Sequence, residues 1–146
     1  MTEVNIENLM REYFKAEEQG DVEKALTFWT EDGIWVSPFG TFKGKEEIKH
    51  YLTWLAKSIQ DKTITDTGIG IMVQGNKAFG EHIMGGKMAG VSGEVLVMGS
   101  WEFSNGKIKR MTVVLDRMMI AKQIAQGWLP KKIINSIIKK LEKGLN

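Results

Sequence analysis

The sequence predicts an α+β fold in which a cone-like, curved antiparallel sheet wraps around N-terminal helices, with an extra C-terminal helix. Apolar residues recur at helical spacing in residues 3–19 and 45–59. From Thr63 onward the apolar period changes to two, which is typical of strands. Glycines within the long strands indicate bends, so a pocket is expected between sheet and helices. These glycines are Gly68, Gly70, Gly80, Gly85, Gly86 and Gly99.

Three helices and a short strand are expected in the first part of the chain. Residues 3–19 are predicted to form the first helix, and Asp21 suits the N-cap of a short second one. The inner stripe of that second helix is expected to include Trp29. Residues 34–37 are predicted to form a strand, and a third helix is expected to begin near Lys45.

The rest of the main domain is predicted to be an antiparallel meander. Ile69, Ile71 and Val73 alternate with small or polar residues, and "QGNK" is a suitable hairpin turn. The following strands are expected at residues 77–88, 94–103 and 107–116, with "SNG" joining the last two.

The domain is expected to span residues 1–117, followed by a basic amphipathic helical extension over 118–146. The extension has six lysines and one acidic residue, Glu142. Its apolar stripe consists of Ile134, Ile137, Ile138, Leu141 and Leu145. The stripe could lie on an anionic membrane surface, or it could dock on the same domain or on a partner subunit. We expect docking and no membrane binding.

Composition excludes several classes of protein. The 146 residues are 42% hydrophobic and contain no cysteine, so one core is expected and disulfide or thiolate chemistry is excluded. A net charge of +2 does not indicate a nucleic-acid binder. The N-terminal residues do not resemble a signal peptide, and no apolar run approaches a membrane span. We therefore expect a cytoplasmic protein.

The common motifs for cofactors and metals are not found. "GIG" at residues 68–70 lacks the third glycine of a dinucleotide-binding loop. His50 and His82 lie far apart on different predicted elements, so no metal site is expected. No serine has the context of a nucleophile elbow. Chemistry without a cofactor, by a few acid–base groups, is the remaining expectation.

Two stretches, "YFKAEEQGDVEKALTFWTEDGIWVSPFGTFKGKEEIKHYL" and "GEHIMGGKMAGVSGEVLVMGSWEFSNGKIKRMTVVLD", resemble the nuclear transport factor 2-like superfamily, in particular its SnoaL-like polyketide cyclase branch. Residues 13–52 contain "GD", "DG" and "PFGTFKG", which are similar to that superfamily's helix and strand junctions. Residues 80–116 resemble its later strands, with His82, "FSNGKI" and a strand ending in Asp116. The resemblance covers residues 10–118 and implies the cone fold, whereas the superfamily includes both enzymes and binders.

The resemblance to ketosteroid isomerases argues against steroid isomerisation. Tyr13 lies where these isomerases have a tyrosine that stabilises an enolate oxygen. Their proton-shuttling aspartate corresponds to Ser37, and their second oxyanion donor corresponds to Gly99. Serine without a partner is a poor base near neutral pH, and glycine offers no side-chain donor. Ser37 therefore marks a missing base.

The resemblance to SnoaL-like cyclases implies a different catalytic set. Asp116 lies where the cyclases have a general acid/base, and His82 corresponds to a histidine of the same pocket. We expect the Asp116 carboxyl group in the main cavity near His82 or Tyr13. Whether His82 or its neighbour Glu81 faces the pocket is left open. Superfamily epoxide hydrolases need an Asp-Arg-Asp set, for which Asp116 and Arg110 are candidates without a second aspartate.

Two functions are expected from these features. The first is a cofactor-independent cyclase, isomerase or lyase that acts on a hydrophobic carbonyl compound, with Asp116, His82 and Tyr13 as catalytic residues. Residues expected to bind this hydrophobic small-molecule ligand are Trp35, Ser37, Met84, Trp101 and Arg110. The second is a non-enzymatic ligand-binding or protein-interaction domain. In both cases a homodimer through the outer face of the sheet is expected.

Overall fold

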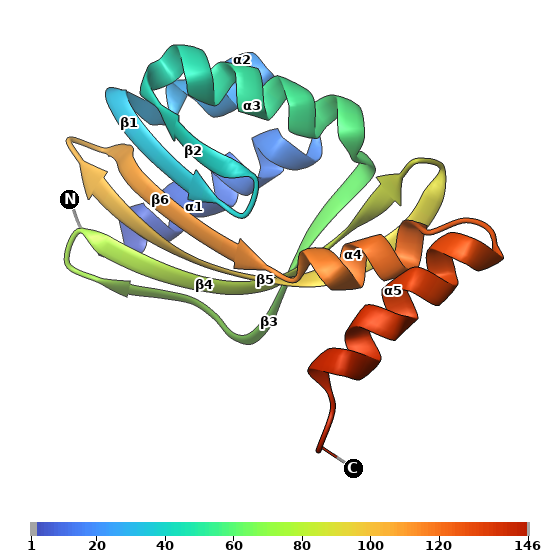
Figure 1. Ribbon diagram of the computed structural model, residues 1–146. Helices are drawn as coiled ribbons and strands as arrows, with labels where there is room; N and C mark the ends of the chain where they lie inside the picture. The colour runs from blue at the N-terminus through green and yellow to red at the C-terminus, as the bar shows by residue number, and fades with distance from the viewer. Residues whose placement is uncertain (1–2, 146) are drawn as a thin grey trace.

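Helices cover one face of a six-stranded sheet in the computed structural model, which describes residues 3–145 (Figure 1). Two further helices extend from one end of the sheet. The elements are α1 (Glu3–Glu18), α2 (Val22–Thr27), β1 (Trp29–Ser37), β2 (Gly40–Lys43), α3 (Gly44–Ser58), β3 (Gln60–Gln74), β4 (Lys77–Met88), β5 (Val91–Ser104), β6 (Lys107–Leu115), α4 (Arg117–Ile124) and α5 (Trp128–Leu141).

The strands follow the order β2-β1-β6-β5-β4-β3. The predicted meander is confirmed, because β3 to β6 each pair antiparallel with their neighbour in sequence. β1 joins the meander in parallel orientation beside β6, with Trp35 opposite Met111. This parallel pair was not predicted. The α+β class is confirmed, and the sheet is bent without being strongly curled (Figure 1).

The strand glycines have two different roles. Gly68 and Gly70 have positive φ angles of 55° and 60°, and the β3–β4 register shifts between Asp66 and Ile71 at that place. Gly99 instead provides space: a Cβ atom there would lie 2.6 Å from the Trp101 ring. Glycine at this position therefore lets the Trp101 indole lie close to the sheet.

The core lies between α1, α3 and the inner face of the sheet, which we define as the face that packs against these helices. Ile6, Met10 and Tyr13 of α1 are fully buried. Burying each large apolar side chain contributes about 1.5–3 kcal/mol, so these helices are fixed mainly by their covered faces. The predicted helical stripe of α3 is buried as well: Ile48, Tyr51, Leu52 and Leu55.

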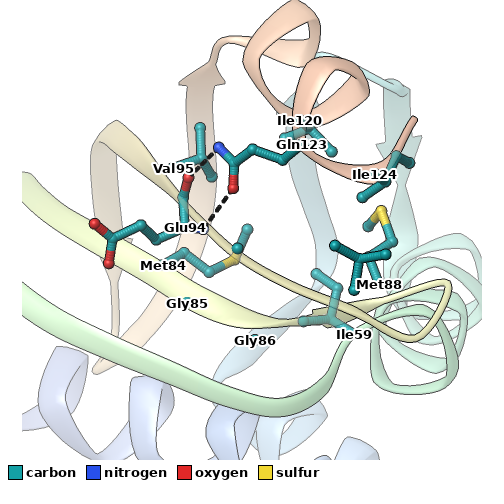
Figure 2. Close-up of a pocket in the computed structure, with 12 residues that line it drawn as sticks. Ile59, Met84, Gly85, Gly86, Met88, Glu94, Val95, Ile120, Gln123 and Ile124 are labelled. Atoms are coloured by element: carbon teal, nitrogen blue, oxygen red, sulfur yellow. Dashed lines mark hydrogen bonds between the residues drawn. The ribbon is translucent and has the colours of Figure 1, made fainter. Parts of the chain in front are cut away.

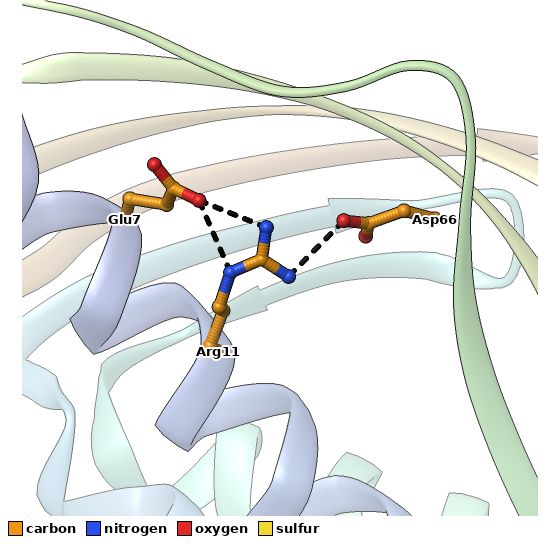
Figure 3. A network of polar contacts seen from close by, with 3 residues as sticks. All are labelled: Glu7, Arg11 and Asp66. Atoms are coloured by element: carbon orange, nitrogen blue, oxygen red, sulfur yellow. Dashed lines mark hydrogen bonds and ion pairs between the residues drawn. The ribbon is translucent and has the colours of Figure 1, made fainter.

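Two ion pairs connect α1 to β3, one outside the core and one inside it. On the exposed side, Arg11 contacts Glu7 at 2.8 Å and Asp66 at 3.0 Å (Figure 3). On the buried side, Lys62 contacts Glu17 at 3.2 Å. Exposed pairs contribute little to stability, whereas a buried pair strongly constrains where its two charges lie.

Several element boundaries differ from the predicted ones. Trp29 begins β1 instead of belonging to the second helix, because the residue before it, Phe28, already accepts a backbone hydrogen bond from Ile108 of β6 at 2.7 Å. β2 was not predicted at all. Residues 118–146 were expected to be helical, and the structure has two helices there, separated at Gly127, whose φ is 82°.

The two C-terminal helices differ in how they contact the domain. α4 packs against β5, and its Gln123 forms two hydrogen bonds with the backbone of Glu94, at 2.9 and 2.8 Å. α5 has no buried residue and extends away from the sheet (Figure 1). No helix within residues 3–145 is long and apolar enough to cross a membrane.

Candidate functional site

A narrow cavity lies between α1, α3 and the inner face of the sheet, and we call it the main cavity. The space in it that the centre of a water-sized molecule can reach is about 60 Å³. Its walls are largely aromatic and aliphatic. Trp35 and Tyr51 form one side, with ring centroids 4.8 Å apart, and Phe14 and Trp101 form another at 5.8 Å. Such walls suit a hydrophobic, ring-bearing molecule.

α4 lies over the open end of the main cavity. Ile120 of α4 lines the main cavity and also a second, smaller pocket between α4 and the ends of β4 and β5 (Figure 2). Figure 2 shows the Gln123 side chain hydrogen-bonded to β5 at the rim of that pocket. A side chain at position 93 would occupy the place of the Gln123 amide, since a Cβ there would lie 2.1 Å from its Oε1. Gly93 is thus needed for this attachment.

Charged groups enter the main cavity as a buried ion pair. Glu17 comes from the last turn of α1 and Lys62 from the start of β3. The Lys62 ammonium donates to Oε2 of Glu17 at 3.2 Å, and the two side chains are only 4% (Lys62) and 10% (Glu17) exposed. Both residues line the cavity. A carboxylate and an ammonium in an apolar cavity can move a proton or stabilise a developing charge on a bound molecule.

His82 is the titratable residue of β4 that faces the main cavity, and this answers the question of Glu81 against His82. It is buried, and its ring lies 5.1 Å from that of Phe14. Burial lowers the pKa of His82, although the negative charges of Glu17 and Asp66 act in the opposite direction. A lowered pKa favours the neutral imidazole, which can both accept and donate a proton.

Two tyrosines surround Glu17. Burial raises the pKa of Tyr13 well above its ordinary value, and the negative charge of Glu17 raises it further. The Tyr13 hydroxyl is directed at Glu17 without a well-formed hydrogen bond, and Tyr13 is not among the residues that line the cavity. Tyr51 does line it, and burial raises its pKa to about 12, although a hydrogen bond with Ser37 acts to lower it.

Three residues that line the main cavity each have an unpaired, buried polar atom. Nε1 of Trp35, Nε1 of Trp101 and Nδ1 of His82 are buried without a hydrogen-bond partner among the described residues. The two indole groups can only donate. Since unpaired buried donors are costly, a bound molecule with oxygen acceptors would satisfy them.

The expected position of Asp116 is wrong. Its side chain is exposed and is the N-cap of α4, accepting hydrogen bonds from the backbone N–H groups of Met118 at 2.8 Å and Met119 at 3.1 Å. The first turn of a helix has unpaired N–H groups, and a carboxylate just before it satisfies them. The carboxylate near His82 and Tyr13 is that of Glu17 instead.

Two of the residues expected to bind ligand do not line the main cavity. Arg110 is exposed, next to Met111, which faces inward. The Ser37 hydroxyl accepts a hydrogen bond from the backbone N–H of Phe39 at 3.1 Å, which fixes the turn after β1. The other three, Trp35, Met84 and Trp101, do line the cavity, and their contact with a ligand stays a prediction.

Sequence reasoning missed Glu17, Lys62 and Tyr51 as cavity residues. Glu17 lies four positions after Tyr13, so both share one face of α1. Lys62 lies two positions before Ile64, so both share one face of β3. These spacings were the available signals. As for metals, residues 3–145 contain no group of three or more His, Asp or Glu side chains that could hold a metal ion.

Comparison with known proteins supports this fold. The model of the SnoaL-like domain family matches residues 10–111. No curated protein shows significant sequence similarity to the chain. The similar solved structures are 18% or 21% identical to the chain, and such similarity shows the fold alone.

Three solved structures illustrate the similarity. A protein from Silicibacter proposed to be a polyketide cyclase has a TM-score of 0.75 at 18% identity, covering 84% of this chain and 96% of its own. TerC, co-crystallised with polyporic acid, has a TM-score of 0.70 at 21% identity, covering 82% and 97%. A hypothetical protein from Catenulispora acidiphila with a ketosteroid isomerase-like fold was solved in complex with trimethylamine. Its TM-score is 0.72 at 18% identity, and the match covers 79% of this chain and 90% of its own.

Proposed function

Because the chain belongs to the SnoaL-like domain family, we propose that its main cavity binds a hydrophobic carbonyl compound and performs acid–base chemistry on it without a cofactor. The reaction would be that of a cyclase, isomerase or lyase. The observation that carries this proposal is the Glu17–Lys62 pair, which is buried and yet lines the cavity together with His82. Buried charges of this kind in an apolar cavity are typical of functional sites.

The polar atoms of the cavity favour a neutral ligand with oxygen acceptors. Lys62 has three N–H donors, and its one hydrogen bond to a described residue is with Glu17. The indole N–H groups of Trp35 and Trp101 add two more donors. The charges of Glu17 and Lys62 balance each other, so a ligand carboxylate would add an unbalanced negative charge in a low-dielectric site. A ketone oxygen adds no net charge to the site.

In the proposed reaction, the polar residues in and beside the main cavity have different roles. Lys62 donates a hydrogen bond to the ligand carbonyl oxygen, and Glu17 accepts a proton from a carbon or hydroxyl group of the ligand. His82 is the second group that exchanges protons. Tyr13, which does not line the cavity, stabilises the Glu17 carboxylate from the side away from the ligand. Glu17 thus takes the acid–base role that the sequence suggested for Asp116. That TerC and the Catenulispora protein were crystallised with small organic molecules supports a ligand-binding use of this fold.

A matched pair of probes tests the proposal: 2-tetralone, a neutral bicyclic ketone, and 2-naphthoate, a carboxylate of similar shape. We expect 2-tetralone to bind more tightly, measured by tryptophan fluorescence and ligand-observed NMR. We also expect the protein to accelerate the exchange of the α-protons of 2-tetralone for deuterium in D₂O, relative to buffer alone. Glu17→Gln with Lys62→Met should slow this exchange by about 10²–10⁴-fold. Failure of both probes to bind would contradict a ligand-binding cavity.

The alternative is a non-enzymatic ligand-binding or interaction domain, and the outer face of the sheet favours it. Apolar residues there pair across strands: Met72 with Phe79, Ile83 with Leu96, and Met98 with Val114. Of these, Met72 and Val114 are more than half exposed. Exposed apolar faces of this kind typically meet a partner.

We propose that a second copy of the chain covers this outer face. Sedimentation should show a dimer at micromolar concentration, and Leu96→Lys should convert it to a monomer. Wild-type protein that sediments as a monomer would contradict the homodimer. Binding of 2-tetralone without any increase in deuterium exchange would favour the non-enzymatic function.

A further inference from the structure

α5 is an amphipathic helix whose apolar residues are not covered. Its apolar face, defined by Leu129, Ile133, Ile137 and Leu141, has one residue in every turn. These side chains are 51%, 52%, 42% and 76% exposed. α1, in contrast, buries its apolar residues against the sheet. α4 packs against β5 of its own domain, whereas the apolar face of α5 is exposed in this single chain.

The charges of α5 indicate what could cover this face. α5 contains four lysines, Lys131, Lys132, Lys139 and Lys140, and no acidic residue, and all four are exposed. On a helical projection Lys131, Lys132 and Lys139 lie on the side opposite the apolar face, whereas Lys140 lies near one edge of it, between Leu129 and Ile133. A groove on a protein would have to match both a wide apolar face and the flanking positive charges.

An anionic bilayer surface matches both properties at once. An amphipathic helix lies in the membrane plane, with its apolar side chains among the acyl chains and its lysines at the anionic headgroups. Trp128 at the start of α5 is 73% exposed, and tryptophan is favoured at the membrane–water interface. Figure 1 shows α5 extending away from the sheet, so the domain leaves most of its length accessible.

We propose that α5 binds the surface of membranes that contain anionic phospholipid and so holds the cavity-bearing domain at the bilayer. The binding is peripheral, because the helix has 14 residues and its lysines stay at the headgroups. Membrane binding replaces the docking expected from sequence. It is independent of the acid–base chemistry proposed for the main cavity.

Vesicle co-sedimentation with the full chain tests this proposal. We expect binding to vesicles of phosphatidylcholine mixed with phosphatidylglycerol, and much weaker binding to phosphatidylcholine alone. Lys139→Glu with Lys140→Glu should weaken binding by at least about 30-fold, since each lysine contributes about 1 kcal/mol near an anionic surface. Ile133→Ser with Ile137→Ser should reduce binding to background. Circular dichroism and thermal unfolding of each variant check that the domain is folded.

A matched control separates α5 from net charge. Lys107→Glu with Lys109→Glu makes the same change of charge on β6, where both lysines are exposed. This control should retain nearly full vesicle binding. Equal loss in both lysine pairs, or wild-type binding that does not depend on phosphatidylglycerol, would overturn the proposal. If Ile133→Ser with Ile137→Ser instead converts a dimer to a monomer and the wild type ignores vesicles, a second copy covers α5 and the proposal is wrong.

Discussion

Helices α1 and α5 are both amphipathic, and the rest of the chain covers the apolar face of only one of them. Met10 and Tyr13 of α1 are fully buried, and the last turn of α1 even brings the charged Glu17 into the cavity wall. Ile137 and Leu141 of α5 are 42% and 76% exposed. An amphipathic pattern thus shows that a helix has an apolar face, whereas tertiary packing determines what covers it.

The largest expected effect concerns the charge buried beside α1. Lys62→Met removes one partner of a buried pair and leaves Glu17 without its counter-ion, so it should lower the free energy of unfolding by about 3–5 kcal/mol. Adding Glu17→Gln should restore most of this loss. Urea unfolding measures both variants. Lys49→Met is the control, because its pair with Glu23 is exposed, and an equal loss in this control would show that burial is not the cause.

The next effect compares the two apolar faces directly. Met10→Ala should lower the free energy of unfolding by about 2–5 kcal/mol, because it leaves a cavity in the core. Ile137→Ala on α5 should change it by no more than about 0.5 kcal/mol. The same unfolding measurement in protein without lipid tests this difference. A large loss for Ile137→Ala would mean that a partner covers α5 in solution.

A smaller effect is expected at Asp116, at the junction between β6 and α4. Asp116→Ala removes the N-cap of α4 and should cost about 1 kcal/mol. Asp116→Asn should cost very little, since asparagine is an equally good N-cap. Neither change should alter the deuterium exchange of 2-tetralone, because Asp116 does not line the main cavity. Loss of exchange in the Asn variant with unchanged stability would return the acid–base role to Asp116.

The smallest effect is a pH dependence of stability due to His82. Burial lowers the pKa of His82 in the folded protein, whereas in the unfolded chain it is about 6.5. The unfolded state therefore binds the proton first as pH falls, and stability should decrease from about pH 6.5 downward. His82→Gln should reduce this dependence of the free energy of unfolding on pH. His50→Gln should leave it unchanged, because His50 is exposed. An equal slope in wild type and His82→Gln would contradict this assignment.

The elements with strong local signals were predictable from sequence. β4 was predicted with its observed ends, since a hairpin turn precedes it, and α3 was predicted from its regular apolar spacing. The parallel β1–β6 pair had no such signal, because residues that meet there, such as Trp35 and Met111, lie far apart in sequence. Trp29 was placed in a helix because its strand partner, Ile108, is also far away in sequence.

The site was harder to predict because one irregularity reverses the phase of β3. Lys62 and Ile64 at even positions line the main cavity, whereas Ile71 and Val73 at odd positions pack on the core. The register shift between Asp66 and Ile71 causes this change. If the alternation of inward-facing and outward-facing residues is extended backward from Ile69 without a break, Lys62 is placed on the outer face. Its position in the cavity could therefore not be predicted. Asp116 was placed in the cavity from its motif position, although the start of α4 provides a closer use for its carboxylate.

The parallel pairing of β1 with β6 also affects the order in which this protein can fold. Trp29 and Trp35 are made early, whereas their partners Ile108 and Met111 are made late in synthesis. Contacts between distant parts of a chain slow folding, and apolar surface that waits for its partner is prone to aggregation. A nascent chain that ends before β6 would leave the two tryptophans of β1 without their neighbouring strand. Completion of β6 is thus the step that closes the sheet, and α4 and α5 follow only after it.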